Sequence, residues 1–174
     1  MNSNGAGSCG WLPESAPRIL PASSLNSATR LADIRDGSSH TLFLGERAHG
    51  RHRPYYLMIA NWWFSSFHGD TFFWSMFPMN PPSELGRNMN QRSPFLGAAG
   101  SFHPGGADFA FADGSVRFIK QTISSWPIDE STRMPIGVTG THETGFQIAV
   151  GTRWGGYQAL STRAGGEIVG LDGE

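Results

Sequence analysis

The stretch ADFAFADGSVRFI, residues 107–119, decides the class of the fold. Large apolar residues alternate with small or polar ones on both sides of Asp113-Gly114, a pair that favours a two-residue β-hairpin turn. With such a turn, Phe111 is expected to lie opposite Val116, because side chains alternate between the two faces of a strand. The apolar side chains expected to share one sheet face are Phe109, Phe111, Val116 and Phe118.

Outside this hairpin, three further segments have recognisable patterns. Residues 40–47 are apolar enough for a mostly buried strand, and Gly45 within them indicates a bulge or a close backbone approach. The Asp36-Gly37 pair before that run is a turn signal. Apolar spacing predicts a helix over 157–164, which Gly165-Gly166 would end.

The composition favours a loop-rich protein with aromatic side chains in its core. The 174 residues include 23 Gly and 11 Pro, only 16% are charged, and 12% are aromatic. A coiled coil or helical bundle needs more Ala, Leu, Glu and Lys, and a disordered chain has fewer aromatics. We therefore expect an α+β fold with an antiparallel sheet, short helices and long loops. Residues 1–30 are expected to be an irregular N-terminal segment, and 31–174 a single globular domain.

Charge and hydropathy exclude several classes of partner. The net charge is −1 and no dense Lys/Arg run occurs, whereas nucleic-acid binders usually carry a basic stripe. No stretch of eighteen apolar residues is present, and residues 1–10 lack the charged and apolar regions of a signal peptide. The single cysteine, Cys9, excludes an internal disulfide. We expect no nucleic-acid partner and no targeting signal in this chain.

Three segments together resemble one protein family. They are DIRDGSSHT with GERA (33–41 and 45–48), HPGG followed by DGSVRF (103–106 and 113–118), and YQALSTRAGGE (157–167). This set resembles the prepilin-type processing-associated family with a His-x9-Asp-Gly motif, pseudopilin-like proteins of unknown function. The motif residues, to which we assign structural roles, are Asp36, Gly37, Thr41, Gly45, Glu46, His103, Pro104, Gly105, Gly106, Asp113, Gly114, Arg163, Gly165 and Gly166.

The resemblance implies the globular head of a pseudopilin-like protein, similar to subunits of type II secretion or type IV pilin systems. It implies a bacterial envelope or extracellular location, a non-enzymatic role in assembly or surface display, and other pseudopilin-like subunits or envelope proteins as partners. Members of the family begin with a long apolar helix that provides the membrane link and is absent from this chain. Because that helix would cover one face of the sheet, an exposed apolar patch is expected here.

Two kinds of cation site remain open as alternatives. Asp113 is typical of a turn, and His103 is expected to form a hydrogen bond with the backbone. In the alternative, both residues act together with Glu46 in a metal-dependent hydrolase. Related pseudopilins bind calcium in a C-terminal loop, which oxygen ligands would suit. The nearby carboxylates are Asp129, Glu130, Asp172 and Glu174. We expect no resident cofactor, with calcium as the one candidate.

An aromatic-rich segment over 62–77 offers another alternative. Trp62, Trp63 and Trp74 are candidates for binding a solute or a glycan by stacking. Core packing is the competing interpretation, because a chain poor in aliphatic residues buries its largest side chains.

Overall fold

The computed structural model describes residues 29–48, 73–81, 97–132, 134–141 and 145–165. In this part of the chain the fold is α+β with antiparallel sheets, as the composition and the hairpin pattern predict. The principal sheet has the strand order β1-β2-β3. Its strands are β1 (Leu42–Gly45), β2 (Gly106–Phe111) and β3 (Val116–Lys120).

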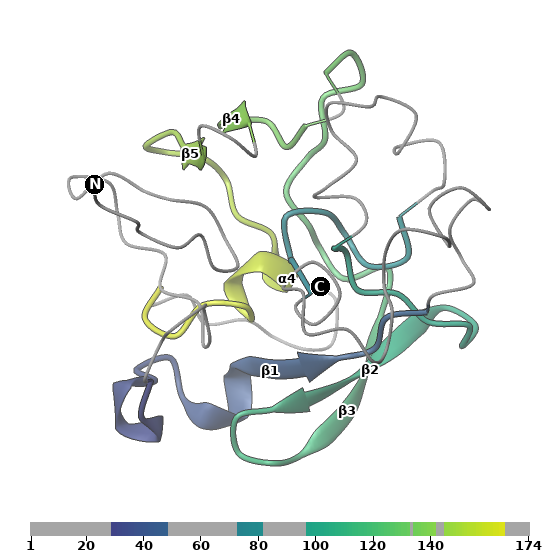
Figure 1. Ribbon diagram of the computed structural model, residues 1–174, viewed down its shortest axis with the longest axis vertical. Helices are drawn as coiled ribbons and strands as arrows, with labels where there is room; N and C mark the ends of the chain where they lie inside the picture. Colours follow the sequence, from purple (N-terminus) through teal and green to yellow (C-terminus); the bar gives the residue numbers. More distant parts are fainter. Residues whose placement is uncertain (1–28, 49–72, 82–96, 133, 142–144, 166–174) are drawn as a thin grey trace, which may run out of the picture.

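The remaining elements are short. They are the 3-10 helices η1 (Leu31–Asp33) and η2 (Ser38–His40), the second hairpin formed by β4 (Val138–Thr141) and β5 (Gly145–Ile148), and α4 (Gly156–Ala159). Figure 1 shows the principal sheet along the lower edge, α4 above it, and β4 and β5 at the opposite end. Among the described residues, no helix is long and apolar enough to cross a membrane.

The β2-β3 hairpin forms where the sequence predicts it, but the predicted register is wrong by one residue. Ala110 pairs with Val116, and Phe109 pairs with Arg117. The loop has three residues, because the Phe111 amide donates to the Ser115 carbonyl (2.8 Å) and the Gly114 amide donates to the Phe111 carbonyl (3.0 Å). Gly114 has φ 84°, as the last residue of a three-residue loop requires.

This extra residue separates the four side chains that were expected to share a face. Phe109 and Phe111 are 0% and 1% exposed, whereas Val116 and Phe118 are 67% and 46% exposed. Because opposite residues point the same way, Arg117 lies on the inner side with Phe109. Its guanidinium lies 4.5 Å from the centre of the Phe111 ring, an arrangement in which cation–π attraction offsets part of the cost of its desolvation.

Gly45 makes the close approach that its position in a strand indicated. The β1-β2 register is irregular between Leu42 and Leu44, so the bulge precedes the glycine. A Cβ at Gly45 would lie 2.6 Å from Cε1 of Phe109 and 3.2 Å from Cε1 of Phe73. Only glycine therefore lets β1 pass this close to the buried Phe109 ring.

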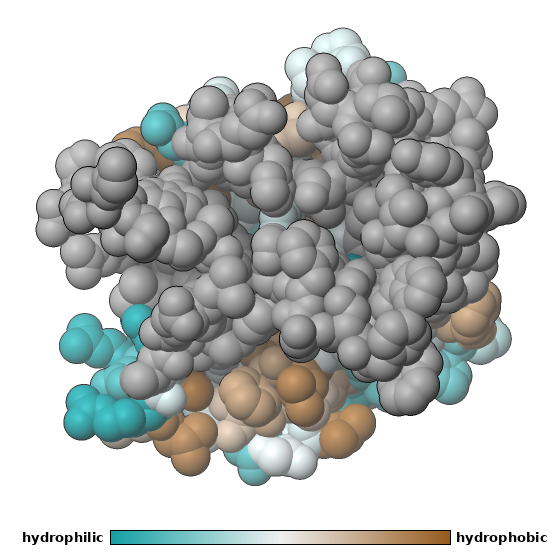
Figure 2. Space-filling view, in the orientation of Figure 1, coloured by the Kyte–Doolittle hydropathy of each residue, from teal (hydrophilic) through white to brown (hydrophobic). Residues whose placement is uncertain are grey.

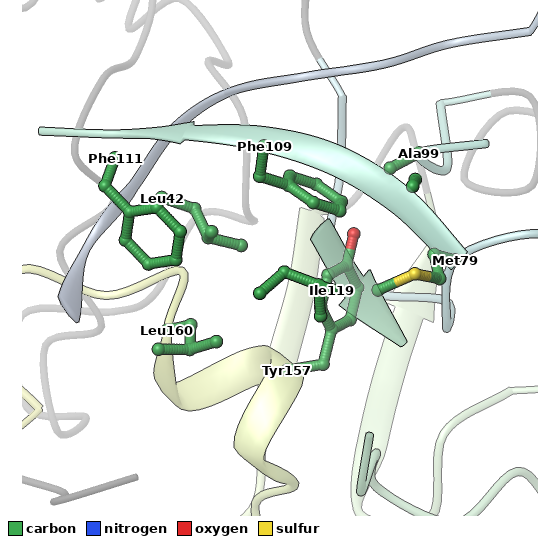
Figure 3. Packing of buried hydrophobic residues seen from close by; sticks show 9 residues of the cluster. Leu42, Met79, Ala99, Phe109, Phe111, Ile119, Tyr157 and Leu160 are labelled. Carbon is green, nitrogen blue, oxygen red and sulfur yellow. The ribbon is translucent and has the colours of Figure 1, made fainter. Parts of the chain in front are cut away.

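The main core lies between the inner sheet face and the segment around α4 (Figure 3). Phe109 contacts Phe73 and Tyr157 edge-on, with ring centres 5.7 and 6.0 Å apart. The buried members of this cluster are Leu42, Met79, Ala99, Ala107, Phe109, Phe111, Ile119, Tyr157 and Leu160. A second cluster contains Met76, Phe77, Ala98, Trp126 and Val138.

The helix expected over 157–164 is only the single turn α4, because tertiary contacts take over the backbone after it. The Leu160 carbonyl accepts a hydrogen bond from the Leu42 amide (2.8 Å). The Thr162 hydroxyl oxygen lies 3.0 Å from the Ala159 carbonyl, within hydrogen-bond distance, and such local contacts compete with helical bonding. Gly165 follows this segment, whereas Gly166 lies outside the described residues.

Candidate functional site

The first and third motif segments are joined through Asp36. One carboxylate oxygen of Asp36 accepts hydrogen bonds from the Thr162 hydroxyl (3.0 Å) and from the Gly165 amide (2.8 Å). The Arg163 carbonyl accepts the Arg35 amide (2.6 Å). Gly37, with φ 92°, makes the turn that follows Asp36. These contacts give Asp36, Gly37 and Gly165 structural roles.

The first and third motif segments and the β2-β3 loop meet at Thr41, which is fully buried. Its hydroxyl lies within hydrogen-bond distance of the carbonyls of Gly37 (3.1 Å) and Thr162 (3.3 Å). Its carbonyl accepts the Ala112 amide (2.9 Å), which belongs to the hairpin loop. Thr41 therefore fastens the β2-β3 loop to the end of the chain that follows α4.

Asp113 has a local role inside that loop. Its Oδ1 accepts hydrogen bonds from the amide (2.9 Å) and the hydroxyl (2.7 Å) of Ser115. Its Oδ2 lies 3.6 Å from a guanidinium nitrogen of Arg117. The Ser115 hydroxyl first, then the Ser115 amide and the Arg117 charge, hold the pKa of Asp113 below its usual value.

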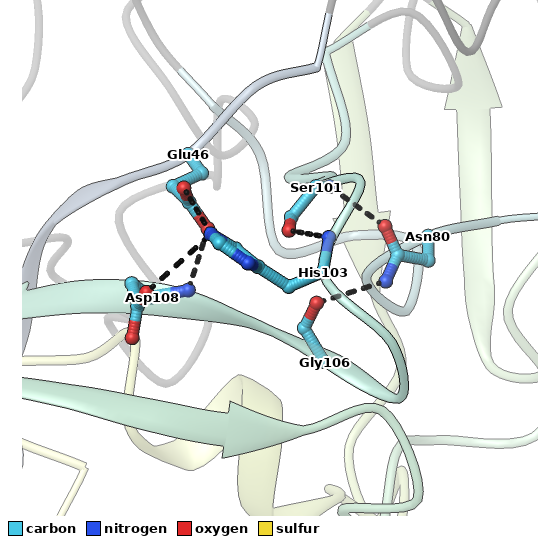
Figure 4. Close-up of polar contacts among 6 residues, drawn as sticks. All are labelled: Glu46, Asn80, Ser101, His103, Gly106 and Asp108. Atoms are coloured by element: carbon cyan, nitrogen blue, oxygen red, sulfur yellow. Dashed lines mark hydrogen bonds and ion pairs between the residues drawn. The ribbon is translucent and has the colours of Figure 1, made fainter.

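A different group of polar side chains lies at the opposite end of β2 (Figure 4). Nε2 of His103 is 3.4 Å from Oε1 of Glu46 and 3.7 Å from Oδ2 of Asp108. The other carboxylate oxygen of Glu46 accepts the Asp108 amide at 2.7 Å. We call Glu46, His103 and Asp108 the β2-end cluster.

A hydrogen-bonded loop positions His103. The His103 amide donates to the Ser101 hydroxyl (2.8 Å), and the Ser101 amide donates to Oδ1 of Asn80 (2.8 Å). The Asn80 amide group in turn donates to the Gly106 carbonyl (3.3 Å). These bonds tie both ends of the turn containing Pro104 and Gly105 to one side chain, so His103 has a fixed backbone.

Gly105 and Gly106 serve this turn in two different ways. Gly105 has φ 79°, a backbone conformation that residues with a side chain rarely adopt. Its carbonyl accepts a hydrogen bond from the Gln121 amide (2.8 Å). A Cβ at Gly106 would collide with the Ile119 carbonyl on the neighbouring strand. The Gly-Gly pair therefore brings the chain from His103 into β2 without a steric conflict.

The β2-end cluster corrects two expectations about the His-x9-Asp-Gly motif. His103 and Glu46 do lie together, but their third partner is Asp108, because Asp113 sits at the other end of β2. The His103 ring faces two carboxylates instead of the expected backbone group. Asp108 was missed because it becomes a neighbour of Glu46 only through the pairing of β1 with β2, where Gly45 is opposite Phe109.

The chemistry of this cluster is that of one imidazole and two carboxylates with partial access to solvent. The side chains of His103, Glu46 and Asp108 are 56%, 37% and 42% exposed. One ligand atom from each lies within 4.8 Å of the other two. In the part of the chain that the structure describes, this is the one group of three such residues able to hold a metal ion.

Comparison with known proteins places the chain in a family. Residues 21–125 match the model of a family described as a protein of unknown function, DUF1559 (SBP_bac_10). The chain belongs to this family. The matched region of this DUF1559 protein includes β1, β2, β3 and the whole β2-end cluster, whereas α4 lies beyond it. No curated protein and no solved structure matches the chain.

The aromatic candidates divide between described and undescribed residues of this DUF1559 protein. Trp62 and Trp63 lie outside the described residues. Trp74 is half-buried and packs against the second core cluster, and the following Met76 and Phe77 belong to that cluster. For residues 73–77, the core interpretation of the aromatic-rich segment fits the packing.

The carboxylates considered for calcium binding are also divided between described and undescribed residues. Asp172 and Glu174 lie outside the described residues, and Glu130 is exposed. Oδ1 of Asp129 accepts hydrogen bonds from the amides and hydroxyls of Ser131 and Thr132. The Ser131 hydroxyl and then the Thr132 amide are the largest influences that lower the pKa of Asp129 to about 2. A turn role explains this carboxylate, and calcium binding stays a prediction.

Proposed function

We propose that this DUF1559 protein is a pseudopilin-like subunit of the bacterial envelope, with a role in assembly or display and no catalytic activity. The observation that supports it is the apolar outer face of the β1-β2-β3 sheet. Leu44, Val116 and Phe118 are exposed on this face, which is the opposite side from the main core. Figure 2 shows brown, hydrophobic side chains gathered along the lower edge of the molecule, where the sheet lies.

This face has the chemistry of a surface that a second layer covers. A sheet is stable when its apolar faces pack against another layer, and the inner face already has one in the segment around α4. Large exposed apolar patches on a protein domain commonly mark interaction sites. We propose that an apolar helix of a pseudopilin-like subunit packs on the outer face.

Family membership supports the same assignment. DUF1559 is often associated with prepilin-like proteins. The structural roles of Asp36, Thr41 and Asp113 agree with motifs that preserve a fold, because each uses its polar atoms to join segments of the chain. Under this proposal the His-x9-Asp-Gly motif fixes the two ends of β2. The partners are then other subunits of an envelope assembly.

Site-specific photo-crosslinking in a bacterium that produces the protein would test this assignment. A photoreactive phenylalanine analogue would replace Val116 on the outer sheet face, with Val150 as the matched control. Val150 is also an exposed valine but lies after β5, away from the principal sheet. We expect position 116 to crosslink to the apolar helix of a pseudopilin-like subunit, identified by mass spectrometry, and position 150 not to do so.

The second arm of this test uses charge. Val116→Asp places a carboxylate on the outer face and should abolish a crosslink from an analogue at Phe118, while the unfolding midpoint changes little. Equal crosslinking from positions 116 and 150, or a crosslink that survives Val116→Asp, would contradict the assembly proposal.

A further inference from the structure

We propose that the β2-end cluster, Glu46, His103 and Asp108, binds a divalent transition-metal ion of the zinc class. The proposal does not depend on the outer-face helix contact, although Asp108 is paired with Phe118, a residue of that face. It rests on three ligand atoms that come together from the end of β1, from the loop before β2 and from β2 itself (Figure 4).

The separations of the ligand atoms suit a metal ion between them. Zinc binds imidazole nitrogen and carboxylate oxygen at about 2.0–2.1 Å, so two ligands at a tetrahedral angle lie roughly 3.4 Å apart. Nε2 of His103 lies 3.4 Å from Oε1 of Glu46 and 3.7 Å from Oδ2 of Asp108. An ion therefore requires only small adjustments of two partly exposed carboxylates.

The donor set selects the class of metal. Calcium requires six to eight oxygen ligands, and magnesium is held mainly by carboxylates and water. An imidazole combined with two carboxylates suits zinc and neighbouring transition metals. With three protein ligands, the fourth position of a tetrahedral ion faces solvent and takes a water molecule.

The charge of the cluster also favours a cation. Among the described residues, the ion pairs of Glu46 and Asp108 are with His103 alone. Two carboxylates therefore share one imidazole. A divalent ion would balance both carboxylates while the imidazole binds it as a neutral ligand.

The ligands are held in place before any ion binds. The bond from the Asp108 amide to Oε2 of Glu46 leaves Oε1 directed at His103. The Ser101 and Asn80 hydrogen bonds hold the His103 backbone, and the His103 ring packs edge-on against Phe118 with 6.4 Å between centres. Outer contacts of this kind orient metal ligands in established sites.

Calorimetric titration of the metal-free chain with ZnCl₂ at neutral pH would test the site. We expect one tight equivalent of zinc that Asp108→Asn weakens by roughly 100-fold or more, because even outer-shell partners account for 10–100-fold in affinity. Asn keeps the shape of Asp and removes its charge. Glu46→Gln provides a second variant, whose amide oxygen still accepts the Asp108 amide hydrogen.

Two control variants separate this site from unspecific binding. Asp113→Asn removes the other motif carboxylate at the far end of β2, and His40→Gln removes an exposed imidazole on η2. Both should bind zinc like the unaltered chain. Zinc affinity in Asp108→Asn within threefold of the unaltered chain would overturn the proposal. So would the absence of a stoichiometric zinc equivalent, which would leave the cluster as an ion pair only, or tighter binding of CaCl₂ than of ZnCl₂.

Discussion

The two faces of the principal sheet are both apolar, but only one is buried. Phe109 and Phe111 on the inner face contact Tyr157, Leu160 and the rest of the main core. Val116 and Phe118 on the outer face remain exposed. Hydrophobicity alone therefore does not say which side of this hairpin faces the core. The difference is set by the register, which depends on one residue in the loop.

Truncation of one aromatic side chain on each face gives the largest expected contrast. Phe109→Ala should lower the free energy of unfolding by about 3–5 kcal/mol, because it leaves a cavity beneath β2. Phe118→Ala should cost about 1 kcal/mol or less, because the ring is already half exposed. Urea unfolding of both variants measures the difference. Equal losses would mean that the outer face is as well packed as the inner one.

Adding a methyl group on the inner face, instead of removing a ring, tests how closely this face is packed. Gly45→Ala places a Cβ against the Phe109 ring and should destabilise the fold by about 1–3 kcal/mol. In the double variant Gly45→Ala with Phe109→Leu, the smaller side chain makes room for the methyl group. Its loss in urea should be less than the sum of the two single losses. If the two losses of unfolding free energy are strictly additive, the side chains at positions 45 and 109 do not interact sterically.

The loop that sets the two faces depends on Gly114. Its φ of 84° lies in the left-handed region, so Gly114→Val should cost about 1–2 kcal/mol. Nothing lies within 4 Å of a Cβ there, so the loss comes from the backbone alone. Gly114→Asn is the control, since Asn tolerates this conformation, and thermal unfolding should rank it between glycine and valine. A valine variant as stable as the unaltered chain would contradict the three-residue loop.

The hairpin could be predicted from residues 107–119, but its register could not. Asp113-Gly114 suits a two-residue turn and equally the last two positions of a three-residue loop. The choice depends on distant contacts: the Ala112 amide donates to the Thr41 carbonyl, and the Asp113 amide donates to the Ser38 carbonyl. Local sequence holds no information about these partners.

The β2-end cluster also shows where prediction from local sequence ends. Glu46 and His103 could be grouped from the sequence, because both belong to the motif segments and carry side chains that can bind a metal ion. Asp108 becomes their neighbour only when β1 lies against β2, a pairing between segments 62 residues apart in sequence. The length of α4 was likewise unpredictable, since Leu160 gives its carbonyl to Leu42 instead of to a continuing helix.

The smallest expected effect concerns Asp113, the loop residue beside Gly114. Asp113→Asn keeps an oxygen that accepts the Ser115 amide, so near pH 7 it should cost less than Phe109→Ala, Gly45→Ala or Gly114→Val. It removes the charge that strengthens the Ser115 hydrogen bonds and attracts Arg117. Because the folded chain holds the pKa of Asp113 below its usual value of 3.8, the carboxylate stabilises the fold above that pH and loses this advantage as the pH falls through the folded value. The stability difference between the two proteins should therefore shrink as urea unfolding is repeated from pH 5 down toward pH 2. A stability difference that stays constant over this pH range would show that the Ser115 and Arg117 contacts do not stabilise the charged form of Asp113. The loop geometry would then depend on Gly114 and on the hydrogen bonds to the Thr41 and Ser38 carbonyls.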